Sequence, residues 1–220
     1  MHSRGEFIVA LSGGQTPRRL YALLATPPFA ARVDWSRVQV CWGDERCAPP
    51  ASTESNYRMA KEALLSRVPL PEANVHRMRG EDAPTREARR YDQVMRTLLG
   101  KAASRLDLVL LGLGADGHTA SLFPGATSVH DSVRWVEAAF HEADATWRIT
   151  LTPRLINLAT EVVFLVSGGG KADIVARVLE GPATPGAFPA QLIAPTNGEM
   201  VWMLDEAAAA GLRRSRPTAT

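Results

Sequence analysis

The segment 112–118, GLGADGH, contains three glycines, an aspartate and a histidine, and it directly follows the strand-length apolar run 106–111. Ligands of open α/β sheets bind beyond the carboxyl ends of the strands, so Asp116 and His118 are expected in a ligand site. A neutral imidazole can accept a proton from water near pH 7, because its unperturbed pKa is about 6.5. His118 is therefore predicted as a general base, although a lone loop histidine is more often only hydrogen-bonded. The other four histidines lack comparable neighbours in the sequence: His2, His76, His130 and His141.

A second candidate site is the segment 12–17, SGGQTP, which follows the apolar run 7–11 and precedes a helical pattern. Gly13 and Gly14 allow a close approach of the backbone to a ligand, and the N–H groups at a helix start favour an anion. The hydroxyl of Thr16 adds a further donor. The segment predicts a phosphate site, with a tight turn that needs glycine only for its dihedral angles as the alternative.

The segment 43–46, GDER, also ends an apolar run, so that Asp44 and Arg46 arrive at a strand end. A guanidinium group has a planar fork that suits phosphate, and its charge would keep a neighbouring carboxylate ionised. The alternative is an ion pair on the surface of a loop. Asn56, shortly downstream, is expected to have a structural role.

Lys171 opens a helical pattern after three glycines, in the segment 167–172, SGGGKA. The nucleotide P-loop would require glycine in place of Leu165 and a hydroxyl residue in place of Ala172, so no triphosphate site is predicted. A cation at the positive end of a helix is unfavourable unless an anion lies nearby. Lys171 is therefore expected to contact an anionic ligand, or else to face solvent.

The glycines at 112, 114 and 117 formally match the dinucleotide-binding pattern, and Glu137 lies at about the expected distance beyond them. That motif requires a long helix after its third glycine, whereas Pro124 interrupts the chain soon after. Nicotinamide binding is therefore the weaker interpretation.

These sites must be held by an alternation of short β-rich runs and helical patterns. Strands are predicted at 7–11, 38–42, 106–111, 148–151, 161–167 and 200–204. Helices are predicted at 17–25, 54–68, 85–103, 153–159, 171–180 and 206–211. Thr16 and Thr152 are expected to cap helices that begin at the prolines after them, and Gly181 to end the helix before it. The alternation predicts a single-domain α/β protein with a doubly wound, mainly parallel, Rossmann-like sheet and helices on both faces.

Composition limits the function further. The 220 residues predict one domain, 1–220, with a frayed tail at 212–220. A formal net charge of +2 without a basic stripe argues against nucleic-acid binding. Cys41 and Cys47 have no partner ligands nearby and are expected to be reduced thiols rather than a zinc site. No apolar segment is long enough for a membrane span or a signal peptide, so a cytoplasmic location is expected.

Taken together, these sites resemble the glucosamine-6-phosphate isomerase/6-phosphogluconolactonase family, and within it the lactonases. The resemblance runs from about residue 7 to 204. It is carried by SGGQTP at 12–17, GDER at 43–46, SN at 55–56, GLGADGHTASLFP at 112–124 and GK at 170–171. It implies hydrolysis of 6-phospho-D-glucono-1,5-lactone to 6-phosphogluconate in the oxidative pentose phosphate pathway, with no metal and no organic cofactor. The implied partner is the phosphorylated sugar lactone alone.

The resemblance also implies roles for individual residues. His118 would activate water, while Asp44 and Asp116 would order the water, the sugar hydroxyls or the histidine loop. The phosphate group would be held by five residues: Gly13, Gly14, Thr16, Arg46 and Lys171. Positioned water and one base suffice for an ester, because its acyl group is already reactive.

Two rivals stay open. The deaminases of the family carry a glutamate where this chain has Phe123, so deaminase activity is less favoured. A non-catalytic sugar-phosphate sensor is the other rival, with little room before residue 7 for a DNA-binding unit. Two departures from the lactonases are Gln15, where serine is common, and the lack of a further strand and helix before Phe7. Such a gap would expose apolar sheet surface, and a monomer or weak homo-oligomer is expected.

Overall fold

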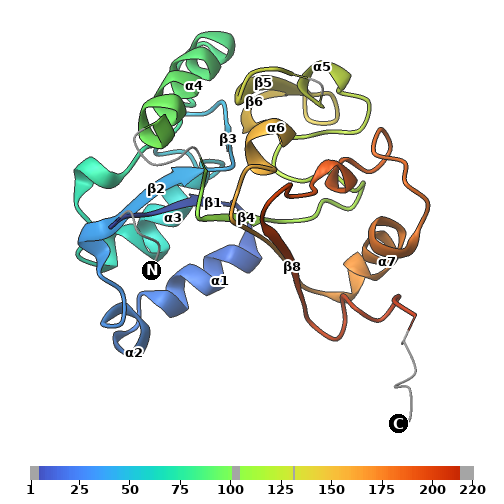
Figure 1. Cartoon of the computed structure of the whole chain (residues 1–220), viewed down its shortest axis with the longest axis horizontal. Coiled ribbons are helices and arrows are strands. Elements are labelled where there is room, and N and C mark those ends of the chain that lie inside the picture. Colours follow the sequence, from blue (N-terminus) through green and yellow to red (C-terminus); the bar gives the residue numbers. More distant parts are fainter. Residues whose placement is uncertain (1–4, 101–104, 131, 214–220) are drawn as a thin grey trace.

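A five-stranded parallel sheet forms the centre of the computed structural model, which describes residues 5–100, 105–130 and 132–213 (Figure 1). Its strand order is β2-β1-β4-β7-β8. The strands are β1 (Phe7–Leu11), β2 (Val38–Trp42), β4 (Leu108–Leu111), β7 (Glu161–Val166) and β8 (Glu199–Leu204). All four pairings are parallel, which confirms the predicted α/β class with a parallel sheet.

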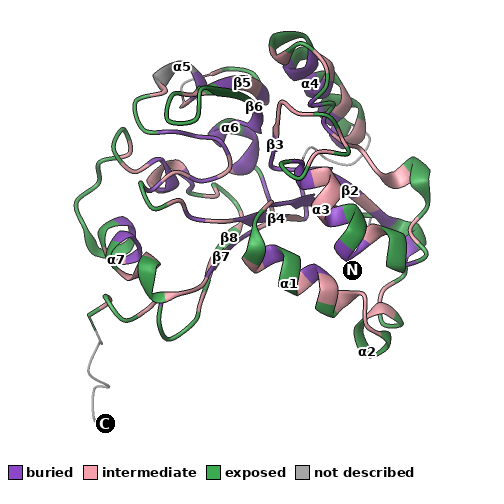
Figure 2. Ribbon diagram, turned by 180° about the vertical axis from the view of Figure 1, so that it is seen from behind, coloured by how far each residue is buried: buried purple, intermediate pink, exposed green. Residues whose placement is uncertain are grey.

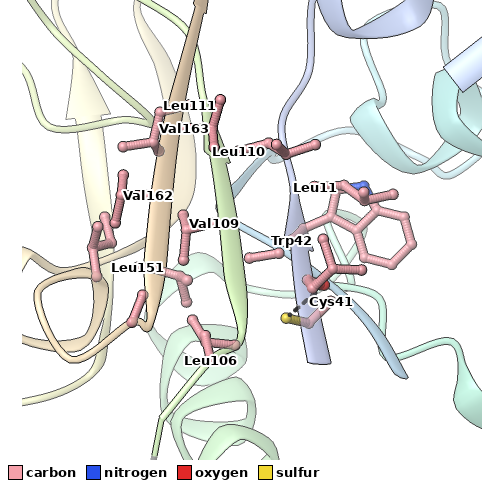
Figure 3. Close-up of a cluster of buried hydrophobic side chains, with 14 of the residues drawn as sticks. Leu11, Cys41, Trp42, Leu106, Val109, Leu110, Leu111, Leu151, Val162 and Val163 are labelled. Carbon is pink, nitrogen blue, oxygen red and sulfur yellow. Dashed lines mark hydrogen bonds between the residues drawn. The ribbon is translucent and has the colours of Figure 1, made fainter. Parts of the chain in front are cut away.

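The central strands are apolar along nearly their whole length because helices cover both faces of the sheet. Residues 8–11 of β1 and 109–111 of β4 are all buried. In Figure 3, Val109 of β4 lies beside Val162 of β7, with Leu11 and Trp42 on the other side. This packing holds the carboxyl ends of β1, β2 and β4 at a common edge.

A second, antiparallel sheet of three strands was not predicted. Its order is β3-β6-β5, with β3 (Asp44–Arg46), β5 (Val136–His141) and β6 (Thr146–Leu151). The chain changes sheet at Gly43, whose N–H donates to Leu11 O of the large sheet while its carbonyl accepts from Leu151 N of the small one. The predicted strand 148–151 thus belongs to the small sheet.

The longer helices are α1 (Gln15–Leu24), α3 (Asn56–Ala63), α4 (Pro84–Gly100) and α7 (Ala172–Glu180). Single turns form α2 (Pro27–Ala30), α5 (Thr127–His130) and α6 (Pro153–Ile156). Short 3-10 helices span Trp35–Arg37, Leu65–Arg67, Glu72–Asn74, Gly169–Lys171 and Pro189–Leu192. α1 contacts α3 on one side of the large sheet, and α4 packs against β5 and β6 on the other (Figure 1).

Several predicted helix ends were wrong. α1 begins at Gln15 with Gly14 as its N-cap, so Thr16 lies inside the first turn and does not cap it. Thr152 is the N-cap of α6 and Pro153 its first residue, as predicted, although the Thr152 hydroxyl donates to Arg134 O and makes no capping hydrogen bond. Gly181 ends α7 as predicted.

The predicted helix at 206–211 is absent, and turns occupy that segment. The Asp205 carboxylate accepts from Ala208 N and from Gly168 N, which ties this segment to the loop after β7. Six residues are too few for helical propensity alone to form a helix. The predicted frayed tail lies outside the described residues from 214 onward.

Burial follows the layers of the fold. Buried residues line the strands, and exposed ones lie on the outer surfaces of α1, α2 and α7 (Figure 2). The edge strand β8 leaves Met200 and Met203 exposed, at 43% and 55% of their full area. Cys41 and Cys47 are free thiols, as predicted. Within the described part of the chain, no helix combines the length and the apolar composition that crossing a lipid bilayer requires.

Candidate active site

A cavity of about 340 Å³ opens at the edge where the carboxyl ends of β1, β2 and β4 meet. Its volume lies within the range of small-molecule sites, which begins at roughly 300 Å³. The structure brings together five residues predicted for the site around this cavity: Gly13, Gly14, Asp44, Arg46 and His118. These residues come from three separate strand ends, as the doubly wound topology requires.

His118 is paired with Asp116. Its Nδ1 lies 2.6 Å from Asp116 Oδ1, and its backbone N–H donates to the same oxygen at 3.1 Å. Burial alone would raise the pKa of Asp116, but the charge of His118 and these hydrogen bonds outweigh it and lower the pKa. An ionised carboxylate at Nδ1 holds the proton on that nitrogen, so Nε2 of a neutral His118 carries the lone pair. The arrangement can therefore accept a proton from water.

Gly114 leaves the space that the pair occupies. A Cβ on Gly114 would lie 2.1 Å from His118 Nδ1 and 2.6 Å from Asp116 Oδ1. Gly117 has a φ of +84°, a left-handed conformation that glycine adopts without strain. Gly114 and Gly117 therefore allow the loop conformation in which His118 pairs with Asp116.

We expect Gly114→Ala to lower kcat by about 100-fold, because displacing a catalytic group by about 1 Å has an effect of that size. Steady-state kinetics on the substrate proposed below would measure it. Gly186→Ala is the matched control, since a Cβ there meets nothing within 4 Å. A Gly114→Ala variant as active as that control would show that the pair tolerates displacement.

Asp44 is held by groups from two other segments. Ser121 Oγ donates to its Oδ2 at 2.7 Å, and Asn56 Nδ2 donates to its backbone carbonyl at 2.9 Å and to Oδ1 at 3.3 Å. A Cβ on Gly13 would lie 1.9 Å from Asn56 Oδ1, so this amide packs directly on the glycine loop. Asn56 therefore holds Asp44 in place, and it also lines the cavity, where a structural role alone was predicted.

Glu45 joins β3 to the start of α3. Its carboxylate accepts hydrogen bonds from Ser55 Oγ and from the backbone N–H groups of Arg46, Asn56 and Tyr57. Burial raises the pKa of Glu45 although these four hydrogen bonds oppose the shift. Glu45 does not line the cavity itself. Its hydrogen bonds fix β3, which carries Asp44, to the start of α3, which carries Asn56.

Two arginines line the cavity from adjacent strands. Arg46 of β3 stands opposite Arg148 of β6 in the antiparallel register. Arg46 Nη1 donates to Glu54 O at 2.7 Å, and Arg148 Nη2 lies 2.6 Å from Asp144 Oδ2. The carboxylate of Asp144 offsets one of the two positive charges, which leaves this wall of the cavity suited to an anion.

Three predicted site residues do not line the cavity: Thr16, Asp116 and Lys171. Asp116 contacts His118, which does line the cavity. Thr16 Oγ1 lies 2.8 Å from Ser167 Oγ, so the glycine loop after β1 adjoins the loop that carries Lys171. Lys171 closes the 3-10 helix of that loop and stands directly before α7. Across the described ranges, no three His, Cys, Asp or Glu side chains gather as metal ligands would.

Sequence reasoning missed a third group in the cavity lining: His141, Asp144 and Arg148. They belong to the β5–β6 hairpin, whose connecting turn contains no glycine and gave no hairpin signal. Ala145 adopts a φ of +52° in that turn. The neighbours of His141 in the sequence do not indicate a site. Only the pairing of β5 with β6 brings His141 to the cavity.

The fold and this cavity define an open α/β enzyme with a histidine–aspartate pair at the carboxyl edge of its parallel sheet. The family model described as "Glucosamine-6-phosphate isomerases/6-phosphogluconolactonase" matches residues 1–202. The chain belongs to this family, which confirms the predicted resemblance.

The individual relatives carry the lactonase name. The chain is 38% identical to 6-phosphogluconolactonase of Haemophilus influenzae over 91% of its length and 85% of the relative. It is 40% identical to that of a Synechocystis species over 96% of its length and 86% of the relative. Among solved structures, the devB protein matches with a TM-score of 0.89 at 38% identity, covering 96% of this chain and 89% of that one.

Two further structures bear on the fold. The 6-phosphogluconolactonase from Trypanosoma cruzi has a TM-score of 0.82 at 30% identity, over 96% of this chain and 86% of that one. A monomeric glucosamine-6-phosphate deaminase has a TM-score of 0.81 at 19% identity, over 94% and 88% of the two chains. At 19% identity this similarity shows a shared fold alone.

Proposed function

We propose that this protein hydrolyses 6-phospho-D-glucono-1,5-lactone to 6-phosphogluconate, a step of the pentose phosphate pathway, with His118 as the base that activates water. The observation that carries the proposal is that His118, which pairs with Asp116, lines the same cavity as Gly13, Gly14 and Arg46. One side of the cavity has a base, and another has donors suited to phosphate. The lactonase names of the relatives support the same substrate.

In the proposed reaction, His118 Nε2 takes a proton from water as the water oxygen attacks the lactone carbonyl carbon. The tetrahedral intermediate then collapses, and the bond between that carbon and the ring oxygen breaks. The protonated imidazole returns its proton to the departing ring oxygen, which becomes a hydroxyl of the product. Asp116 keeps the proton on Nδ1 through the cycle and stabilises the imidazolium form.

Asp44 is proposed to order the water or the sugar hydroxyls. Asp44 is 8% exposed, and its carboxylate receives hydrogen bonds from Ser121, three residues after His118, and from Asn56. It therefore links the histidine loop to the glycine loop through Asn56, which packs on Gly13.

The phosphate group is proposed to lie at the start of α1, against the N–H groups of the loop containing Gly13 and Gly14 and the guanidinium of Arg46. The first turn of α1 contains no acidic residue, so its positive end is available to an anion. Thr16, in the first turn of α1, and Lys171, directly before α7, would complete this phosphate site. The contact between Thr16 and Ser167 joins these two parts of the chain.

Phe123 favours this reaction over the deaminase reaction. Its ring centroid lies 5.2 Å from that of His118, in the position where the deaminases of the family carry a glutamate. An apolar ring there cannot support a ring-opening histidine by charge or by a hydrogen bond.

The proposal is tested by giving the purified protein freshly generated lactone and glucosamine 6-phosphate in parallel. We expect turnover of the lactone well above its uncatalysed opening, and no release of ammonia from the amino sugar. Ammonia release without lactone turnover would overturn the proposal.

A further inference from the structure

The β5–β6 hairpin carries a second histidine–aspartate pair into the cavity. His141 is the last residue of β5, and its Nδ1 lies 2.9 Å from Asp144 Oδ1, a charge contact whose angle falls outside that of a hydrogen bond. The other oxygen of Asp144 lies 2.6 Å from Arg148 Nη2. Asp144 is thus shared between an imidazole and a guanidinium, and all three residues line the cavity.

Phe123 contacts both imidazole rings. Its ring stacks on His141 with centroids 4.2 Å apart and an interplanar angle of 24°. The centroids of His118 and His141 are 6.4 Å apart. The second imidazole is therefore fixed by stacking at the end of the cavity where His118 acts.

The charge on Asp144 decides which ring nitrogen of His141 is available. A hydrogen bond from Thr146 and the charges of His141 and Arg148 lower the pKa of Asp144 to about 2, although burial opposes the shift. Asp144 is therefore ionised at neutral pH, and a proton on Nδ1 of His141 is favoured beside it. Nε2 of neutral His141 is then an acceptor, and no group in the described ranges forms a hydrogen bond with it.

We propose that His141 is a further substrate-contacting residue, which accepts a hydrogen bond from the hydroxyl on the carbon next to the lactone carbonyl. This inference rests on the proposed function. In that function the phosphate lies against Gly13, Gly14 and Arg46, and the lactone carbonyl faces His118, all of which line one cavity. The hydroxyl nearest to that carbonyl is the one on the adjacent carbon, and His141 offers an acceptor on a ring whose centroid lies 6.4 Å from that of His118. The contact would select sugar acids that carry this hydroxyl.

His141→Phe is the sharpest variant, because it keeps a ring that can stack on Phe123 and removes both nitrogens. It is tested on the natural lactone and on 2-deoxy-6-phosphoglucono-1,5-lactone, which lacks the hydroxyl. We expect the variant to lose about fivefold to tenfold in kcat/KM on the natural lactone, mainly through KM, as one neutral hydrogen bond would give. The wild type should lose a similar factor in kcat/KM when the natural lactone is replaced by the 2-deoxy lactone. On the 2-deoxy lactone the variant and the wild type should have similar kcat/KM.

Equal losses by His141→Phe on the two substrates would overturn the contact, and so would an unchanged kcat/KM on the natural lactone. His141→Asn is the second variant, since its amide oxygen can still accept a hydrogen bond and should retain part of the selectivity. His76→Phe is the matched control, because His76 contacts Gln39 outside this cavity. A wild-type protein without lactone turnover would instead reject the proposed function, whatever the variants do.

Discussion

His118→Ala is expected to lower kcat for lactone hydrolysis by roughly 10²–10⁴-fold, the range that one general base contributes. Affinity for 6-phosphogluconate should change little, because the proposed phosphate contacts lie on other segments of the cavity. The measurement combines initial rates, corrected for uncatalysed opening of the lactone, with calorimetric titration of the product. The two readouts separate loss of the base from loss of the site.

The matched control for His118→Ala is His76→Ala, which removes an imidazole from outside the cavity. Asp116→Asn is expected to reduce kcat less than His118→Ala does, since it removes the charge that orients the ring and leaves the base in place. Undiminished turnover by His118→Ala would reject His118 as the base. The alternative base would then be His141, the other imidazole in the cavity lining.

The second large effect is expected at the phosphate end. Arg46→Ala and Lys171→Ala should each weaken binding of 6-phosphogluconate by about 10-fold to 100-fold, the value of a hydrogen bond to a charged group. Binding of gluconate, which lacks the phosphate, should change far less. The comparison matters because Arg46 also donates to Glu54 O, and a general disturbance of that loop would weaken both ligands alike.

Titration calorimetry with the two sugar acids measures this difference. Arg86→Ala provides the control for loss of one positive charge, because Arg86 is exposed on α4 and pairs with Asp82. Equal losses on the phosphorylated and unphosphorylated ligands would assign Arg46 and Lys171 to another role. A loss for Arg46 alone would agree with the cavity lining, which includes Arg46 and not Lys171.

The hydrophobic pattern was a reliable guide to the large sheet. Run 7–11 is apolar throughout, and run 38–42 is apolar except at Gln39, because both faces of a parallel sheet are buried. The strands of the large sheet were predicted within a few residues of their observed ends. Helix ends were less predictable. The Thr16–Pro17 pair resembles a cap, yet Gly14 is the N-cap and the Thr16 hydroxyl contacts Ser167, which is 151 residues away.

The small sheet shows where local pattern fails. β3 is three residues long and continues directly from β2 after Gly43, so no composition change marks it. β5 contains Glu137 and exposed Phe140, and its half-buried pattern is weak. Its strand structure depends on pairing with β6, an interaction that propensity within the segment does not contain.

Local sequence pattern was enough to predict the parallel sheet, the glycine turns after three strands and the residues able to bind phosphate or move a proton. These follow from local rules of burial, backbone freedom and side-chain chemistry. Three contacts of the site could be seen only in the folded chain: Arg46 faces Arg148, Asn56 packs on Gly13, and His141 lines the same cavity as His118. Such contacts join segments through strand register and packing, and no periodicity within either segment encodes them.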